Sequence, residues 1–261
     1  MSSPLLSHFR VRRGFVVATV AALLGAGFGA AQAADVTVSA AASLTNAFKE
    51  AATAYEAQNA GSKVLLNFAA SDALLQQIAK GAPVDVFASA DQETMDKADA
   101  QKLLAAGSRK SFVSNGLVVV TPIDSKLPMA TLADLQPAAV AKVALGNPAS
   151  VPAGRYAKSA LEAAKLWPQV EAKAVYAQSV RQSLDYVARG EVEAGFVYAT
   201  DAYVMKDKVR IAFPVPTETP VLYPIAAVSG GPNTDGGKKF IDFVLSPAGQ
   251  AVLAKYGFQK P

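Results

Sequence analysis

Short apolar segments alternate with helical stripes along the first third of the chain. Residues 36–38, 63–68 and 84–89 are predicted to be buried strands, because each is a short run rich in apolar residues. After each strand, apolar residues recur three or four positions apart, which predicts an amphipathic helix. The three stripes are Leu44, Ala47, Phe48, Ala51 and Tyr55; Leu74, Leu75 and Ile78; and Met95, Ala98 and Leu103. This β-α-β-α-β-α order predicts a parallel sheet with helices on both faces.

The same alternation begins again after Pro122. A strand at 115–122 ends the first unit, and further strands are predicted at 143–145, 175–177, 194–198, 211–213 and 223–228. Helices are predicted at 152–164, 179–190 and 238–245, another helix is expected to start at Thr200-Asp201, and residues 248–256 form a tail. Two α/β units, with the C-terminal residues returning to the first, indicate two lobes, each a doubly wound sheet. We expect residues 34–114 plus 224–261 in one lobe and 115–223 in the other. Segments 115–120 and 221–228 are expected to cross between the lobes as a hinge, with a ligand cleft between the lobes.

The first 33 residues have the three parts of a secretory signal peptide. Arg10, Arg12 and Arg13 precede an apolar run over 14–30, and Ala31-Gln-Ala33 is a small-x-small cleavage site. A membrane anchor is the alternative, but a run of about 17 residues rich in Ala and Gly is a marginal span. We expect cleavage after Ala33 and export.

The composition of the remaining chain excludes much chemistry. Three of the 25 Lys and Arg residues and none of the 21 Asp and Glu residues lie in the signal peptide, which leaves 22 basic against 21 acidic residues. The sequence contains no run of basic residues that would indicate nucleic-acid binding. The chain has no Cys, and its only His, His8, lies in the signal peptide. A Ser-His-Asp triad, a Cys nucleophile and a usual zinc site are therefore excluded. Carboxylate-only catalysis stays open, so a secreted hydrolase that uses paired carboxylates is an alternative.

Ser43 and Ser71 each stand where a predicted strand passes into a helix. Ser43 is expected to be the N-cap of its helix. A helix start has unpaired backbone N–H groups and a partial positive charge, so an anion can bind there. In a parallel sheet, both serines would lie beyond the carboxyl ends of the strands, where ligands collect. A purely structural cap is the alternative for either serine.

Five motifs, in order and with family-like spacing, closely resemble the periplasmic molybdate-binding proteins of ABC transporters, which are type II periplasmic binding proteins. The motifs are Ala40-Ala-Ala-Ser43-Leu-Thr-Asn46, Gly81-Ala-Pro-Val-Asp85-Val-Phe, Ser89-Ala-Asp91, Val151-Pro-Ala-Gly154-x-Tyr156-Ala and Gly195-Phe-Val-Tyr198-x-x-Asp201. The resemblance covers residues 35–258. It implies a periplasmic monomer that binds a small oxyanion, molybdate or tungstate, for an inner-membrane ABC permease. It implies neither enzymatic activity nor a cofactor nor a bare metal cation.

The resemblance also implies five ligand residues. Ser43 and Ser71 would offer hydroxyl and backbone N–H groups, Ala153 and Val180 backbone N–H groups, and Tyr198 its phenol. Core packing is the alternative for Val180, and a buried strand-end aromatic is the alternative for Tyr198.

Asp72 departs from the family pattern, in which a small neutral or hydroxyl residue is usual. A desolvated carboxylate facing a dianion would be costly, so we expect Asp72 to point outward and complement the helix dipole. A sister receptor for sulfate or phosphate is the alternative function. Phosphate can carry a proton and would favour a carboxylate acceptor such as Asp72 turned inward.

Overall fold

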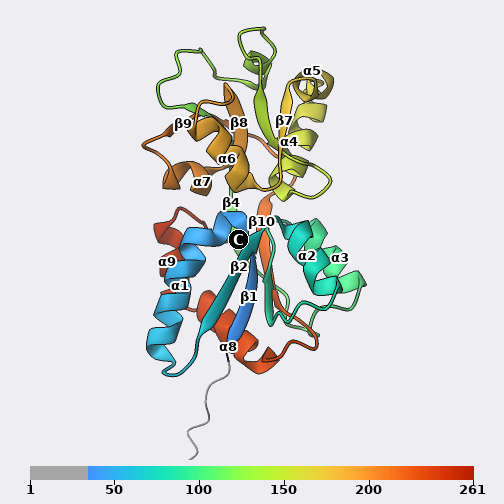
Figure 1. Cartoon of the computed structure of the whole chain (residues 1–261), viewed down its shortest axis with the longest axis vertical. Helices are drawn as coiled ribbons and strands as arrows, with labels where there is room; N and C mark the ends of the chain where they lie inside the picture. Colours follow the sequence, from blue (N-terminus) through green and yellow to red (C-terminus); the bar gives the residue numbers. More distant parts are fainter. Residues whose placement is uncertain (1–34) are drawn as a thin grey trace, which may run out of the picture. The chain divides into compact units, whose positions relative to one another are not determined.

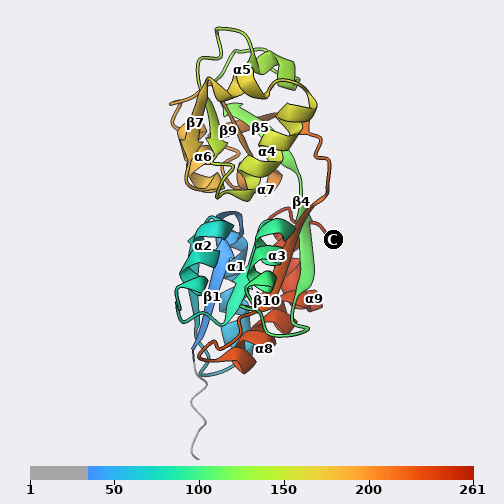
Figure 2. The ribbon, with the colours of Figure 1, turned by 90° about the vertical axis from the view of Figure 1, so that its right-hand side faces the viewer.

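The computed structural model describes residues 35–261, and the predicted signal peptide lies outside the described residues. Within this part of the chain, the strands form two five-stranded sheets flanked by helices (Figures 1 and 2). Their strand orders are β2-β1-β3-β10-β4 and β7-β6-β8-β5-β9. None of the helices in residues 35–261 is long and apolar enough to cross a membrane. The expected α/β architecture with two separate sheets is confirmed.

In the first sheet, β1 (Val36–Ala41) is an inner strand between β2 and β3. It pairs in parallel with β2 (Val64–Ala69) and β3 (Val86–Ala88). β10 (Val221–Ala227) is antiparallel to both β3 and β4 (Lys110–Asn115). Nearly every residue of β1 is buried, as expected for a strand that helices cover on both faces.

Two groups of helices cover the two faces of the first sheet (Figure 1). One group comprises α1 (Thr45–Gln58), α8 (Thr234–Leu245) and α9 (Pro247–Lys255), and the other α2 (Ser71–Ala79) and α3 (Gln92–Ala100). Each group buries its own apolar cluster against the strands. The apolar stripes predicted from the sequence therefore pack against the sheet. This packing positions the start of each helix at an edge of the sheet.

Aromatic rings fill the core on the α1 and α8 face. Phe48 and Tyr55 of α1 pack edge-on against Phe240 of α8, with ring centroids 6.0 and 5.4 Å apart. Leu74 and Met95 fill the core under α2 and α3, where both are fully buried. Because β1 and β2 run parallel, the helices that follow them, α1 and α2, begin at the same end of the sheet.

The second sheet repeats this plan. β6 (Val143–Gly146) pairs in parallel with β7 (Ala174–Ala177) and β8 (Ala194–Tyr198). β5 (Leu117–Pro122) is antiparallel to both β8 and β9 (Val209–Val215). The helices of this lobe are α4 (Pro152–Ala163), α5 (Trp167–Glu171), α6 (Val180–Ala188) and α7 (Ala199–Val204).

The chain passes between the two sheets twice, and both passages are short. β4 ends at Asn115 and β5 begins at Leu117, so the first passage is at Gly116. The second passage comprises residues 216–220, between β9 and β10. The first passage lies within the predicted segment 115–120, and the second lies just before the predicted segment 221–228, because β10 lies wholly in the first sheet. The lobe boundaries at residues 114/115 and 223/224 stay a prediction.

Candidate functional site

In both lobes, parallel strands are followed by helix starts, either directly or after a short loop. In the first lobe, β1 runs into a 3-10 turn, Ala42–Leu44, and β2 runs into α2. In the second lobe, β6, β7 and β8 lead into α4, α6 and α7. The predicted ligand residues all lie at these junctions, and each is at most 4 % exposed: Ser43, Ser71, Ala153, Val180 and Tyr198. Helix starts carry unpaired N–H groups, so these junctions are rich in donors.

Ser43 does not cap a helix, and the expectation that it would is wrong. It lies inside the 3-10 turn, and α1 begins only at Thr45. Its hydroxyl shares a hydrogen bond of 3.0 Å with the phenol of Tyr223 on β10. The same phenol oxygen accepts a hydrogen bond from the Asn115 amide at 3.2 Å. A partner 180 residues away in the chain thus fixes the Ser43 side chain.

The hydroxyls of Ser71 and Tyr198 both hydrogen-bond to the backbone of one residue, Ala90. Ser71, the first residue of α2, accepts a hydrogen bond of 3.0 Å from the backbone N–H of Ala90. Tyr198, on the other lobe, donates to the carbonyl of Ala90 at 3.5 Å. The Tyr198 ring also packs against Tyr223, with centroids 5.6 Å apart. Through Ala90 and Tyr223, the structure brings three of the predicted side chains, those of Ser43, Ser71 and Tyr198, together.

The two tyrosines are neutral hydrogen-bonding groups. Burial raises the pKa of both Tyr198 and Tyr223 well above the ordinary value of a phenol. Each phenol therefore keeps its proton at neutral and mildly alkaline pH, and Tyr198 can act as a donor throughout this range.

Ala153 and Val180 lie in the first turns of their helices. Pro152 is the first residue of α4, a position that suits its fixed φ, and Ala153 follows it. The start of α4 approaches β6 so closely that a Cβ on Gly154 would overlap the carbonyl of Gly146. Val180 is the first residue of α6, whose N-cap Ser179 accepts from the Gln182 N–H at 3.2 Å.

Two arginines that sequence reasoning missed connect these helix starts to the first lobe. Arg155 of α4 forms ion pairs with Asp72 and Asp91, at 2.7 and 2.6 Å. Arg181 of α6 donates to the carbonyl of Ser43 at 3.2 Å. A signal was present in the sequence: both arginines fall in the first turn of a helix, where the dipole disfavours a cation unless it has a nearby acceptor.

Asp72 does not point outward, and that expectation is also wrong. It is 7 % exposed, and its carboxylate accepts hydrogen bonds from Thr94, Lys97 and Arg155. Burial alone would raise the pKa of Asp72, but the bonds and charges of Arg155 and Lys97 outweigh it and lower the pKa. The cause lies in tertiary packing, since Arg155 is 83 residues away in the chain.

Two cavities lie where the lobes meet, and each is bordered by one of these arginines. A cavity of about 710 Å³ is lined by Ala70 and Gln76 of the first lobe and by Ser179 and Arg181 of the second. Another, of about 400 Å³, is lined by Asp91, Arg155 and residues 217–220. The five predicted ligand residues line neither of these cavities, and all five are buried. Within residues 35–261, no cluster of three or more carboxylate, His or Cys groups suits a metal ion.

Comparison with known proteins places this arrangement in a family. Residues 36–259 match the family model described as bacterial extracellular solute-binding protein. The chain belongs to this family. Relatives of this solute-binding protein include "Molybdate-binding protein ModA" of Haemophilus influenzae, 36% identical over 93% of this chain and 96% of the relative. The Escherichia coli protein of the same name is 38% identical, over 89% of this chain and 92% of the relative.

A solved structure of a periplasmic binding protein has a similar fold to this solute-binding protein. The periplasmic molybdate-binding protein of Azotobacter vinelandii superposes with a TM-score of 0.78 at 23% identity, over 87% of this chain and 99% of that chain. The two-lobed binding-protein fold and the family resemblance inferred from the five motifs are both confirmed.

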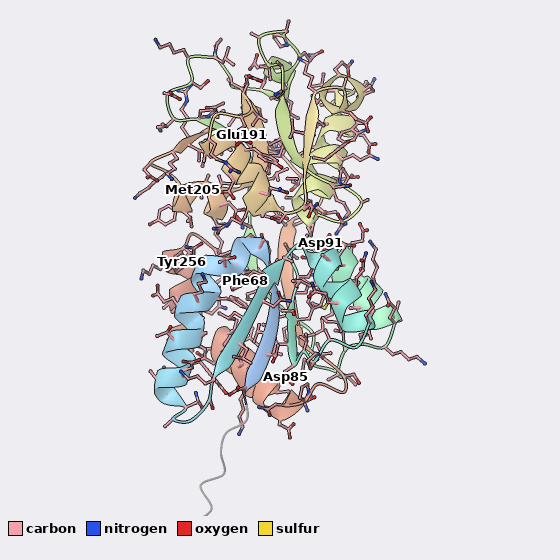
Figure 3. All side chains as sticks on the ribbon, in the orientation of Figure 1. Phe68, Asp85, Asp91, Glu191, Met205 and Tyr256 are labelled. Atoms are coloured by element: carbon pink, nitrogen blue, oxygen red, sulfur yellow. The ribbon has the colours of Figure 1, made fainter. Side chains whose placement is uncertain are left out.

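One motif of the resemblance has a structural role in this solute-binding protein. Figure 3 shows Asp91 at the end of the first lobe nearest the second lobe, and Asp85 at the opposite end. The fully buried Asp85 carboxylate accepts hydrogen bonds from the backbone N–H groups of Thr37 and Asn233. It therefore ties β1 to the segment that leads into α8, away from the predicted ligand residues.

Proposed function

We propose that this protein is the periplasmic solute-binding component of a molybdate ABC importer, and that it also binds tungstate. The observation that carries the proposal is that Ser43, Ser71 and Tyr198 are linked through Tyr223 and Ala90, with Tyr198 contributed by the second lobe and both serines by the first. Ala153 and Val180 lie at the helix starts joined to the same interface by Arg155 and Arg181. The similarity to relatives named for molybdate supports the choice of ligand.

The proposed donor set suits a fully deprotonated tetrahedral dianion. Molybdate and tungstate carry no proton at neutral pH, so their site needs donors and no acceptors. Helix-start N–H groups and neutral hydroxyls supply such donors without a buried free cation. The Tyr198 phenol stays protonated because burial raises its pKa.

The alternatives differ in what they ask of the site. A phosphate receptor would use a carboxylate to accept the phosphate proton, but Asp72 is held by Thr94, Lys97 and Arg155. Sulfate makes the same hydrogen bonds as molybdate but is smaller, so discrimination against it would rest on the size of the closed site. The engagement of Asp72 favours molybdate over phosphate.

Capture and delivery, without chemistry on the ligand, complete the proposal. The protein would be exported by its signal peptide, residues 1–33, which is then cleaved. It would act as a monomer and release its anion to an inner-membrane permease. Closure of the lobes would bring the donors of Ala153, Val180 and Tyr198 onto an anion first bound at Ser43 and Ser71.

Calorimetric titration of the exported protein with molybdate, tungstate, sulfate and phosphate tests the proposal. We expect one molybdate or tungstate per chain and much weaker binding of sulfate and phosphate. A preference for sulfate or phosphate would defeat the assignment. A retained molybdenum X-ray absorption edge after purification would support it independently.

A further inference from the structure

The guanidinium of Arg155 joins the second lobe to three carboxylates of the first. Its Nη2 atom is 2.7 Å from Asp72 and 2.6 Å from Asp91, and its Nε atom is 3.5 Å from Glu93. The side chains of Arg155, Asp72 and Asp91 are only 16, 10 and 5 % exposed. Removing one partner of an ion pair so far removed from water is strongly destabilising, because the charge of the other partner is left buried and uncompensated.

These ion pairs lie beside the proposed ligand residues in the chain. Asp72 directly follows Ser71 at the start of α2, and Arg155 is two residues after Ala153 at the start of α4. The contact between Arg155 and Asp72 therefore links the helix starts that carry two proposed donors, one from each lobe. Closure that forms the ion pair also brings these two donors toward each other.

Without Arg155, the first lobe would present excess negative charge at its edge. Lys97 pairs with Asp72 and Glu93, at 3.2 and 2.7 Å. Among the ion pairs of residues 35–261, Asp91 has Arg155 as its only cation, although it also accepts from the Thr94 N–H as the cap of α3. Carboxylates that close to a bound dianion would repel it, and the repulsion is strong where water is excluded.

We propose that Arg155 is a positioning residue for anion capture, whose ion pairs with Asp72 and Asp91 form on closure and hold the lobes together. The same ion pairs cancel carboxylate charge beside the anion, so that closure and binding reinforce each other. Arg155 acts through the carboxylates and does not touch the anion. This inference rests on the proposed function.

The test compares Arg155→Met, Arg155→Lys, Asp72→Asn and the double variant Arg155→Met/Asp72→Asn. Stopped-flow dissociation rates and calorimetric Kd values for molybdate are the readouts, with circular dichroism to confirm folding. We expect Arg155→Met to weaken binding by about tenfold or more, mainly through faster dissociation. Arg155→Lys should fall between wild type and Arg155→Met, because it keeps the charge but loses the planar fork.

The double variant separates positioning from simple structural support. It should bind more tightly than Arg155→Met alone, because one uncompensated carboxylate has been removed, so the two changes are non-additive. Unchanged dissociation in Arg155→Met, or strictly additive effects, would overturn the inference. If Arg155→Met does not fold, Arg155→Lys carries the same test, and wild-type dissociation rates in it would be equally decisive against the inference.

The proposed function can be disproved independently of the role of Arg155. A wild-type protein that does not bind molybdate overturns the ligand assignment, and the variants are then compared with tungstate or sulfate, whichever the wild type binds. A wild type that binds none of the three overturns both proposals.

Discussion

Arg181 of the second lobe donates a hydrogen bond of 3.2 Å to the backbone carbonyl of Ser43 in the first lobe. Its guanidinium also donates to the Asn46 side chain at 2.8 Å and is ion-paired with Asp201 of its own lobe at 2.5 Å. Arg181 thus crosses the interface to neutral acceptors, while a carboxylate on its own lobe balances its charge. Arg155 differs, because it pairs with the carboxylates Asp72 and Asp91 of the first lobe, but the charge of each interlobe arginine is balanced by a carboxylate.

Removing the two serine hydroxyls should abolish ligand-induced stabilisation. We expect Ser43→Ala/Ser71→Ala to show no rise in Tm on addition of molybdate, because two of the proposed donors are lost. The ligand-free protein should stay folded with a Tm lower by a few degrees, since the Ala90 N–H loses the acceptor Ser71. Differential scanning fluorimetry with and without molybdate measures both effects.

Ser111→Ala is the matched control for the serine variant. Ser111 is exposed, and its hydroxyl accepts only a surface hydrogen bond from Gln92 among the bonds described. It should keep the full molybdate-induced shift. A double serine variant that also kept this shift would remove Ser43 and Ser71 from the site.

Tyr198→Phe should weaken molybdate binding without unfolding the protein. The ring would keep its packing against Tyr223, while one hydrogen bond to a charged ligand, about 1.5–3 kcal/mol, would be lost. This corresponds to a Kd roughly 10 to 100 times higher. Calorimetry measures the change, and Tyr176→Phe, whose side chain is exposed on β7, serves as the control.

The raised pKa of the Tyr198 phenol leads to a prediction about molybdate affinity at alkaline pH. Because burial holds the pKa of Tyr198 well above its ordinary value, molybdate affinity should not fall between pH 7 and pH 9. A titration of affinity with a midpoint in this interval would contradict the assignment of Tyr198 as a neutral donor.

Periodicity predicted most strands and helices because each buried face is a local pattern. The starts of α2, α4 and α6 follow from stripes that begin next to Ser71, Pro152 and Ser179. The positions of these starts at the lobe interface then follow from the parallel order of the strands. Local pattern was therefore sufficient to name the junctions where the candidate ligand residues lie.

Side-chain direction at these junctions could not be predicted in the same way. Ser43 looked like a cap because its tertiary partner, Tyr223, belongs to the last strand. Asp72 looked solvent-facing because its partner Arg155 lies on the other lobe. Both errors concern a buried polar group whose partner is distant in sequence, and composition and spacing carry no information on such pairs.

Asp72→Asn should destabilise the protein at neutral pH and have little effect in strong acid. Arg155 and Lys97 lower the folded-state pKa of Asp72, whereas the unfolded-state pKa stays near its ordinary value of about 3.9. The charge interactions of Asp72 therefore stabilise the fold above about pH 4, and this contribution is lost as the pH falls through the lowered pKa. Urea denaturation of both proteins at pH 7, 5 and 3 measures the difference.

The other charged groups around Asp72 are Asp91 and Glu93, which share Arg155 with it. Both carboxylates are present in the wild type and in Asp72→Asn, so the two proteins differ only in the charge at position 72. Asp235→Asn is the control, because that side chain is 91% exposed and should change stability little at any pH. A loss in Asp72→Asn that is the same at pH 7 and pH 3 would mean that packing, and not charge, is responsible.

Arg181→Met should destabilise the ligand-free protein by about 3–5 kcal/mol, because Asp201 is fully buried and would lose its cation. Burial already raises the pKa of Asp201 while Arg181 opposes the shift, so the variant should raise this pKa further. A carboxyl with a raised folded-state pKa makes the protein less stable as the pH rises, so the stability of the variant should be closer to that of the wild type at pH 5 than at pH 8.

The double variant Arg181→Met/Asp201→Asn should recover much of the stability lost at pH 8, since an Asn oxygen can still accept from the Tyr198 N–H. Denaturation curves that show the same loss at both pH values, with no recovery in the double variant, would assign the effect to the contacts of Arg181 with Ser43 and Asn46.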